Sequence, residues 1–145
     1  MAPRAVSDEA YVVSLCDEIL GERGQRQQRF VWLRGDPGPT GRRASLPVDA
    51  FYPSHALVVE YHERQHDEAV ELFDRRQTVS GVNRGEQRRR YDERRRIEVP
   101  AHGLTLVVVS ASDLDADSRG RLRRSRSHDL TVLRERLAKY ARADE

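Results

Sequence analysis

Apolar residues recur along this chain with two different periods, which predicts a mixture of helices and strands. In residues 8–20 they fall at helical spacing, and Ser7, just before them, can cap a helix. In 46–51 and 56–62 apolar and polar residues alternate, and the intervening residues 52–55 contain the turn formers proline and serine. The pattern predicts an amphipathic helix near the start of the chain and a β-hairpin at its centre.

The rest of the chain supplies further elements of both kinds. A short apolar run predicts an inner strand, and a dense β-branched run predicts a strand that is buried on both faces. Pro100 is expected to end the second of two helices that follow the hairpin. In chain order the expected segments are a loose tail 1–7, a strand 27–33, a loop 35–45, a helix 67–77, a loop 78–85, a helix 86–97, a strand 104–109, a mobile linker 110–127 and a helix 128–142. This order predicts one domain, 1–145, of the α/β (α+β layered) class, with a mixed sheet flanked by helices.

Composition limits the classes of protein that need consideration. The net charge of +2 gives no strong overall attraction to nucleic acid, so any attraction must come from local clusters. The single cysteine, Cys16, excludes an intramolecular disulfide and cysteine zinc sites. No stretch approaches the roughly 20 apolar residues of a membrane span, and the N-terminus has no apolar signal core. We therefore expect a cytoplasmic protein that does not enter a membrane.

The central hairpin carries the residues with the clearest chemical potential. Glu60 and His62 point to one face of their strand because successive side chains alternate, and Asp49 lies about level with them on the partner strand. Two carboxylates this close repel each other unless a cation lies between them, which favours Mg²⁺ or Mn²⁺. Each residue also has a structural alternative, since Asp49 can cap or pair with an arginine and His62 can be a surface group.

The order of these residues resembles that of the PD-(D/E)XK nuclease superfamily. The segment VDAFYP…LVVEYHERQH, followed by QRRRYDERRRIEVPAHGLTLVVVSASDL, is similar to the branch of very-short-patch-repair-type endonucleases, and the likeness covers residues 7–114. It implies a restriction-endonuclease-like mixed sheet flanked by helices. It also implies a Mg²⁺-dependent or Mn²⁺-dependent endonuclease, a hydrolase of phosphodiester bonds in DNA.

The resemblance assigns metal ligands to matching positions. Asp49 and Glu60 would bind the metal, and the backbone carbonyl of Tyr61 would add a ligand. A glutamate of the first helix often helps the metal site in the superfamily, and Glu18 is the match chosen here. A glutamate at the edge of a helix face can equally be a plain solvated group.

The resemblance also assigns the catalytic groups, with one departure from the family pattern. The usual catalytic lysine is missing, because all 26 basic residues except Lys139 are arginine, so His62 would take its place as base. Gln65 and His66 match a Gln-His pair that would hold a phosphate oxygen or donate a proton to the leaving group. The arginine bias has a simple alternative origin in the codon usage of a GC-rich genome.

Arginines gather in 84–96 and 119–126, where they could neutralise phosphates. The expected nucleic-acid-binding residues are Arg84, Arg88, Arg90, Arg94, Arg95, Arg121 and Arg124. The alternative for the first cluster is a solvated helix laced with salt bridges.

Two further functions stay open at this point. One is a catalytically inactive nuclease-fold module that binds DNA or regulates through its arginines. The other is a small structural protein that forms a homodimer through a narrow apolar stripe near its C-terminus. The stripe consists of Leu130, Leu133, Leu137 and Tyr140, whose first expected use is packing on the sheet.

Overall fold

A computed structural model of the chain describes residues 6–63 and 84–141. In these parts the chain is a mixed α/β structure with a four-stranded mixed sheet and three α-helices. The elements are α1 (Asp8–Leu20), β1 (Gln25–Pro37), β2 (Arg43–Tyr52), the 3-10 turn η1 (Pro53–His55), β3 (Leu57–His62), α3 (Arg84–Ala101), β4 (Thr105–Ser110), the 3-10 turn η3 (Ala111–Asp113) and α4 (Arg126–Leu137). The mixed α/β class expected from the sequence is confirmed.

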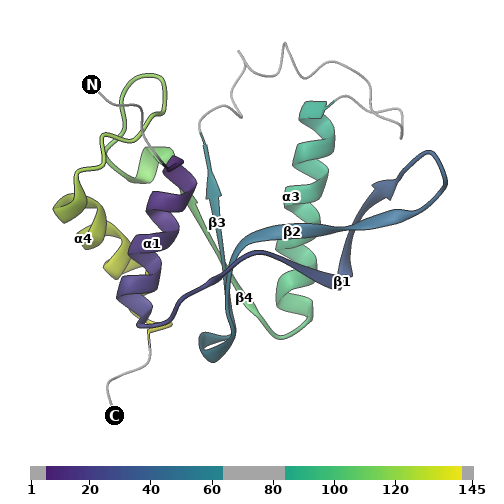
Figure 1. Cartoon of the computed structure of the whole chain (residues 1–145), viewed down its shortest axis with the longest axis horizontal. Coiled ribbons are helices and arrows are strands. Elements are labelled where there is room, and N and C mark those ends of the chain that lie inside the picture. The colour runs from purple at the N-terminus through teal and green to yellow at the C-terminus, as the bar shows by residue number, and fades with distance from the viewer. Residues whose placement is uncertain (1–5, 64–83, 142–145) are drawn as a thin grey trace.

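The sheet combines antiparallel and parallel pairing in the order β1-β2-β3-β4. β1 and β2 pair antiparallel, as do β2 and β3, whereas β4 runs parallel to β3. A parallel neighbour needs a long connection, and α3 lies within the one between β3 and β4. Figure 1 shows α1 and α4 together on one side of the sheet and α3 on the other.

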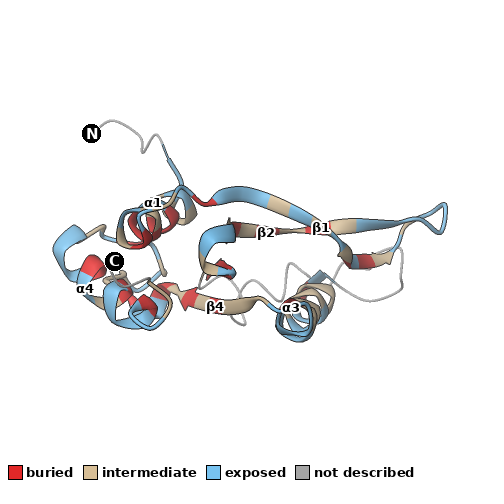
Figure 2. Ribbon diagram, turned by 90° about the horizontal axis from the view of Figure 1, so that it is seen from below, coloured by how far each residue is buried: buried red, intermediate tan, exposed pale blue. Residues whose placement is uncertain are grey.

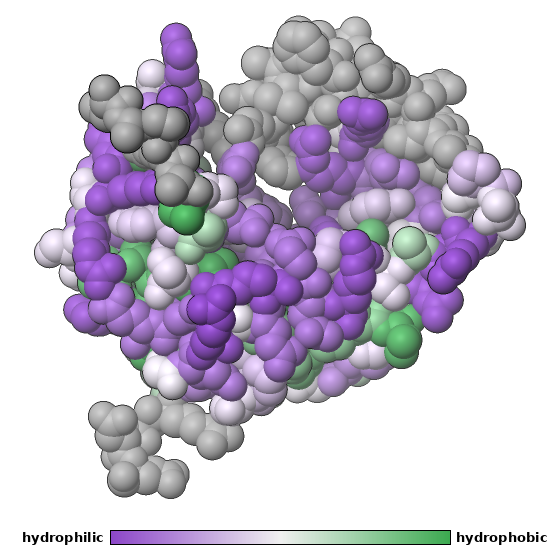
Figure 3. Space-filling model, in the orientation of Figure 1, coloured by the Kyte–Doolittle hydropathy of each residue, from purple (hydrophilic) through white to green (hydrophobic). Residues whose placement is uncertain are grey.

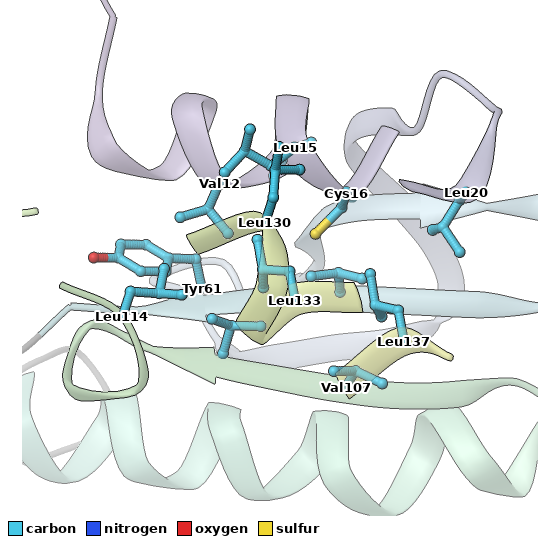
Figure 4. Packing of buried hydrophobic residues seen from close by; sticks show 14 of the residues in the cluster. Val12, Leu15, Cys16, Leu20, Tyr61, Val107, Leu114, Leu130, Leu133 and Leu137 are labelled. Carbon is cyan, nitrogen blue, oxygen red and sulfur yellow. The ribbon is translucent and has the colours of Figure 1, made fainter. Parts of the chain in front are cut away.

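The larger core lies between α1, α4 and the sheet, as Figure 4 shows. Figure 2 shows the buried residues of α1 and α4 on the sides that face each other and the sheet. Ser7 caps α1 by accepting a hydrogen bond from the Ala10 N–H, and Gly21, at φ +66°, ends it. Both boundaries of this helix agree with the sequence pattern.

The apolar stripe near the C-terminus is used inside the molecule. α4 ends at Leu137, short of the expected 142, and Leu133 and Leu137 are fully buried. Leu130 is also buried, and Tyr140, beyond the helix, packs against the same core. The expected packing of the stripe on the sheet is therefore confirmed.

The β1–β2 ribbon turns over near its middle. In β2, Ala50 and Tyr52 belong to the core under α1, whereas Leu46 and Val48 belong to a second core under α3. Strict alternation would keep all four side chains on one face, so the pattern is interrupted at Asp49. The ribbon accordingly passes from the side of α1 to the side of α3 in Figure 1.

Three expectations for the strands are wrong. β1 is an edge strand of the described sheet instead of an inner one, and Val31 is 75% exposed. The loop expected at 35–45 is shorter in the structure, because β1 and β2 stay paired as far as Pro37↔Arg43. This backbone pairing does not depend on the identity of the side chains. β4 also lies at an edge and is buried on one face only.

The segment expected to be a mobile linker, 110–127, instead has a defined arrangement. Leu122 is fully buried and forms a β-bridge with Ala116. The Leu122 N–H donates to Asp8 Oδ2, and Arg124 pairs with the same Asp8 at 3.0 Å. Contacts to α1 therefore order a segment whose composition suggested a linker.

The expected helix 86–97 is longer in the structure. α3 extends to Ala101 with Pro100 in its last turn, and the helix ends one residue after this proline, which cannot donate the backbone hydrogen bond that would continue it. The expected helix 67–77 lies outside the described residues, as does most of the loop 78–85. No helix in the described ranges combines the length and apolarity that crossing a membrane requires.

Candidate functional site

Asp49 and Glu60 meet where the pairing between β2 and β3 stops. The last backbone pair on this side is Ala50↔Val59. One step further, the Asp49 N–H donates to Glu60 Oε2 at 2.5 Å, and the Tyr61 N–H donates to Asp49 Oδ2 at 2.8 Å. Side-chain oxygens thus replace backbone acceptors, and both carboxylates turn into the gap between the two strands.

This arrangement differs from the expected pair of acids on one face of a regular hairpin. Glu60 lies on the α3 side, because its neighbours Val59 and Tyr61 belong to the core under α1. Asp49 lies where β2 turns over, so its side chain also reaches the α1 side. The two acids are brought together through the gap and not by a shared face.

Glu9, in the first turn of α1, is the helix glutamate that reaches this site. Burial, the charge of Asp49 and a hydrogen bond with it, and the charge of Glu63 raise the pKa of Glu9 to about 7. The Gln27 side chain donates to Glu9 Oε2 at 3.1 Å, which acts in the opposite direction. Sequence reasoning missed Glu9 because an acid in a first helical turn has an ordinary explanation in the helix dipole.

The structure does not bring Glu18 to this group. Glu18 is half exposed and pairs with Arg126 of α4, with Nη2–Oε distances of 2.5 and 2.6 Å. It lies nine residues after Glu9, about two and a half helical turns, so the two side chains leave α1 on opposite faces. The structure therefore places Glu18 away from Asp49 and in an ion pair with Arg126.

A network of charged groups links Glu60 and His62 to α3. Arg95 Nε lies 3.3 Å from Glu60 Oε1, and Arg95 Nη1 lies 3.2 Å from Asp92 Oδ1. His62 Nε2 lies 3.9 Å from the same Asp92 oxygen. Glu60 and His62 thus share the α3 side, as strand alternation predicts, and Arg95 also donates to the carbonyl of Pro47.

Glu60 is an unusually buried carboxyl group. It is only 4% exposed, and burial together with the nearby charge of Asp49 raises its pKa to about 8, although the Arg95 charge and the Asp49 N–H act in the opposite direction. One arginine therefore does not compensate the acidic charge at this point.

Tyr61 contributes both backbone and side chain near the gap. The N–H and C=O of a strand residue point to the same neighbouring strand, so the Tyr61 carbonyl faces β2 and Asp49, as its expected ligand role requires. Its hydroxyl is buried and has no hydrogen-bond partner among the described residues.

Beside the charged network a cavity of 620 Å³ opens between α3, β3 and β4. It is lined by Glu60, His62, Arg89, Asp92, Glu93, Arg95, Arg96, Leu106 and Val108. Its size is within the range of small-molecule pockets, and charged groups of both signs converge on an apolar floor.

Most arginines expected to contact nucleic acid have acidic partners. Arg94 lies 2.5 Å from Asp36, Arg90 lies 3.2 Å from Glu86, and Arg124 pairs with Asp8. Arg84 is exposed at the start of α3, and Arg88 is half-buried one turn later. For α3 this favours the alternative of a helix laced with salt bridges.

Arg119 and Arg121 are exposed in the loop that precedes α4. Their backbone N–H groups both donate to Asp117 Oδ1, which fixes the loop, and no acidic side chain of the described residues pairs with their guanidinium groups. With Asp8 and Glu63 they line a shallow cavity of 330 Å³. Figure 3 shows mainly hydrophilic residues on the face of the molecule that Figure 1 presents.

Gln65 and His66, the expected Gln-His pair, lie outside the described residues. The groups that the sequence did not indicate are Glu9, Gln27 and Asp92. Asp92 and Gln27 offered no signal, because one lies in a helix full of charge and the other in an ordinary polar run.

The described residues offer two neighbouring carboxylates, Asp49 and Glu60, and no complete metal cage. No group of three or more Asp, Glu, His or Cys residues within 6–63 and 84–141 meets the geometry of a metal site. Mg²⁺ does not need one, because it keeps several waters and binds through one or two carboxylates and a substrate phosphate. The raised pKa values of Glu9 and Glu60 indicate acidic charge around Asp49 that such a cation would neutralise.

Comparisons of the chain with family models, curated proteins and solved structures found no match, so similarity assigns neither a family nor a function to it.

Proposed function

We propose that this protein is a metal-dependent nuclease-like enzyme that hydrolyses phosphodiester bonds in nucleic acid, with DNA as the first candidate, on a restriction-endonuclease-like fold. The observation that carries the proposal is the meeting of Asp49 and Glu60 in the gap between β2 and β3. Each carboxylate accepts a backbone N–H of the other strand, but two acids this close with one arginine beside them remain costly to bury. A divalent cation would explain why the chain keeps them there.

The topology is consistent with this proposal. A helix precedes three antiparallel-paired strands, and a helix then leads to a strand parallel to β3. This is the helix-strand-strand-strand-helix-strand order that the sequence resemblance implies for a nuclease of this superfamily.

The proposed roles follow from position. Asp49 and Glu60 would hold Mg²⁺ or Mn²⁺, with the Tyr61 carbonyl as a further ligand and Glu9, beside Asp49, as the alternative second carboxylate. The bound ion would polarise the phosphate and lower the pKa of a water molecule. His62, two residues after Glu60 on the same side, would accept the proton of that water, and Asp92 would orient the imidazole.

One observation favours a second function. Arg95 already holds Glu60, and the chain has no lysine near the site. In an inactive nuclease-fold module, Arg95 would stabilise the buried acid permanently, and the exposed Arg119 and Arg121 would bind the nucleic acid backbone. This alternative predicts binding without cleavage.

Cleavage of plasmid, branched and single-stranded DNA in Mg²⁺ or Mn²⁺ distinguishes the two functions. For an enzyme we expect wild-type cleavage, a loss of at least about 100-fold in Glu60→Gln, and no change in the matched control Glu135→Gln on the exposed side of α4. Wild-type protein that binds DNA in an anisotropy assay but does not cut it would support the inactive module.

Measurements of Mn²⁺ affinity distinguish the proposed role of Glu9 from that of Glu18, the other glutamate of α1. Because Glu9 lies beside Asp49 and Glu18 pairs with Arg126, Glu9→Gln should weaken Mn²⁺ binding on the order of 10-fold, whereas Glu18→Gln should leave it unchanged. Titration with Mn²⁺ followed by electron paramagnetic resonance of the free ion measures both. Equal affinities in the two variants would contradict the role of Glu9.

A further inference from the structure

Gln27 has an unusual backbone at the level of the candidate site. β1 and β2 pair at Arg26↔Ala50 and at Gln28↔Val48, which places Gln27 opposite Asp49, yet this pair is absent from the ladder. Gln27 has φ +51°, a left-handed conformation that non-glycine residues seldom adopt in a strand. The register is the same on both sides, so no inserted residue accounts for it.

A glutamine is a costly choice at this position. Glycine adopts positive φ without strain, whereas an L-residue with a side chain is strained there. Such strain persists where the surrounding structure or a function requires it. The contacts of the Gln27 side chain therefore bear on why a residue other than glycine occupies this position.

The contact that the side chain makes is with the first turn of α1. Gln27 Nε2 donates to Glu9 Oε2 at 3.1 Å, and Glu9 lies beside Asp49. β1 is an edge strand of the described sheet. The Gln27 carboxamide therefore connects this edge to α1, at the level where the β1–β2 ribbon turns over.

We propose that Gln27 is a positioning residue, which uses its left-handed backbone to aim its carboxamide at Glu9 and so holds that carboxylate beside Asp49 for binding a divalent cation. The inference rests on the proposed metal site, and adds to it an outer residue that orients a ligand. Residues of this kind typically change metal affinity by 10–100-fold when they are replaced.

The test compares glycine substitutions at two neighbouring positions. Gln27→Gly removes the carboxamide and relieves the backbone strain, so we expect Mn²⁺ binding weakened on the order of 10-fold with an equal or higher unfolding temperature. Gln28→Gly, the matched control, pairs regularly with Val48 and donates to the backbone of Arg29, so we expect a lower unfolding temperature and unchanged Mn²⁺ affinity. Paramagnetic resonance of free Mn²⁺ and thermal unfolding without metal give the two readouts.

The outcomes separate this inference from the proposed function. If wild-type protein binds Mn²⁺ and Gln27→Gly binds it equally well, Gln27 does not position the ligand, and the metal site stands without it. If Gln27→Gly lowers affinity and unfolding temperature together, and Gln28→Gly does the same, the loss belongs to the strand and the inference is overturned. If wild-type protein binds no Mn²⁺, both the metal site and the inference fail.

Discussion

The buried carboxyl group of Glu60 has fewer compensating partners than a buried charge requires. Glu60 is almost fully enclosed, accepts a hydrogen bond from the Asp49 N–H and touches one guanidinium group, that of Arg95. A buried charge without full compensation destabilises the folded state. The candidate site should therefore be visible in stability measurements before any activity is known.

The pH dependence of unfolding tests the state of Glu60. Its pKa rises from an ordinary 4.5 to about 8 on folding, so the folded protein binds more protons than the unfolded one between these values. Stability from this group is present below pH 4.5 and is lost as the pH rises toward 8. Glu60→Gln should remove that loss and be more stable than wild type at pH 8, by on the order of 1 kcal/mol after the lost Arg95 pairing is allowed for.

Urea unfolding of both proteins at pH 5 and pH 8 measures this difference. The matched control is Glu93→Gln, an exposed residue of α3, whose stability difference from wild type should be the same at both pH values. A Glu60→Gln protein that is less stable than wild type at pH 8 would show that Glu60 is held ionised by its partners.

Among the elements, α4 shows how an apolar stripe finds its partner within one chain. Its leucines enter the core beneath α1, and Leu133 is fully enclosed (Figure 4). A stripe used in this way has no apolar face left for a second copy. The stripe therefore stabilises the fold of the single chain, and we expect no homodimer to form through it.

Shortening Leu133 tests this use of α4. Leu133→Ala should lower the free energy of unfolding by about 3 kcal/mol, the usual cost of a cavity in a packed core. Thr131→Ala, on the exposed side of the same helix, should change it by less than about 0.5 kcal/mol. Light scattering should give the same mass for wild type and Leu133→Ala, and a mass that halves in the variant would instead indicate a dimer held by the stripe.

The positive and negative charges of the whole molecule nearly cancel, but they are distributed unevenly over it. The net charge is only +2, and most arginines of α3 are already paired with acids. The exposed Arg119 and Arg121 lie in the loop before α4, where they share a shallow cavity with Asp8 and Glu63. Attraction to a phosphate backbone should therefore come from this loop and not from the molecule as a whole.

The salt dependence of DNA binding tests this distribution. Each neutralised phosphate adds about 0.9 to the slope of log affinity against log salt concentration, so Arg119→Ala combined with Arg121→Ala should reduce the slope by about 1.8. The matched control combines Arg134→Ala on α4 with Lys139→Ala just after this helix and should leave the slope unchanged. Fluorescence anisotropy at several salt concentrations gives both slopes, and equal slopes in wild type and the loop variant would rule the loop out as the contact.

The sequence by itself determined the features that depend on neighbours along the chain. The cap at Ser7, a helix stop at Gly21 or Gly24 (Gly21 in the structure), the turn after β2 and the alternation in β3 all follow from local preferences of the backbone. The leucine stripe of α4 was equally readable, because periodic burial leaves a periodic pattern. The pairing of an acid on each strand of the hairpin also came from the sequence, though not its geometry.

Only the tertiary structure decided which distant groups meet. Glu9 and Glu18 lie on the same helix, and neither has a local sequence signal that identifies a metal ligand. The packing of α1 brings Glu9 to Asp49, whereas Glu18 pairs with Arg126 of α4. The turn-over of the ribbon at Asp49, the edge position of β1 and the approach of Arg95 to Glu60 likewise depend on how sheet and helices stack. These contacts join residues that are far apart in the chain. The sequence near either residue therefore contains no local pattern that predicts the contact.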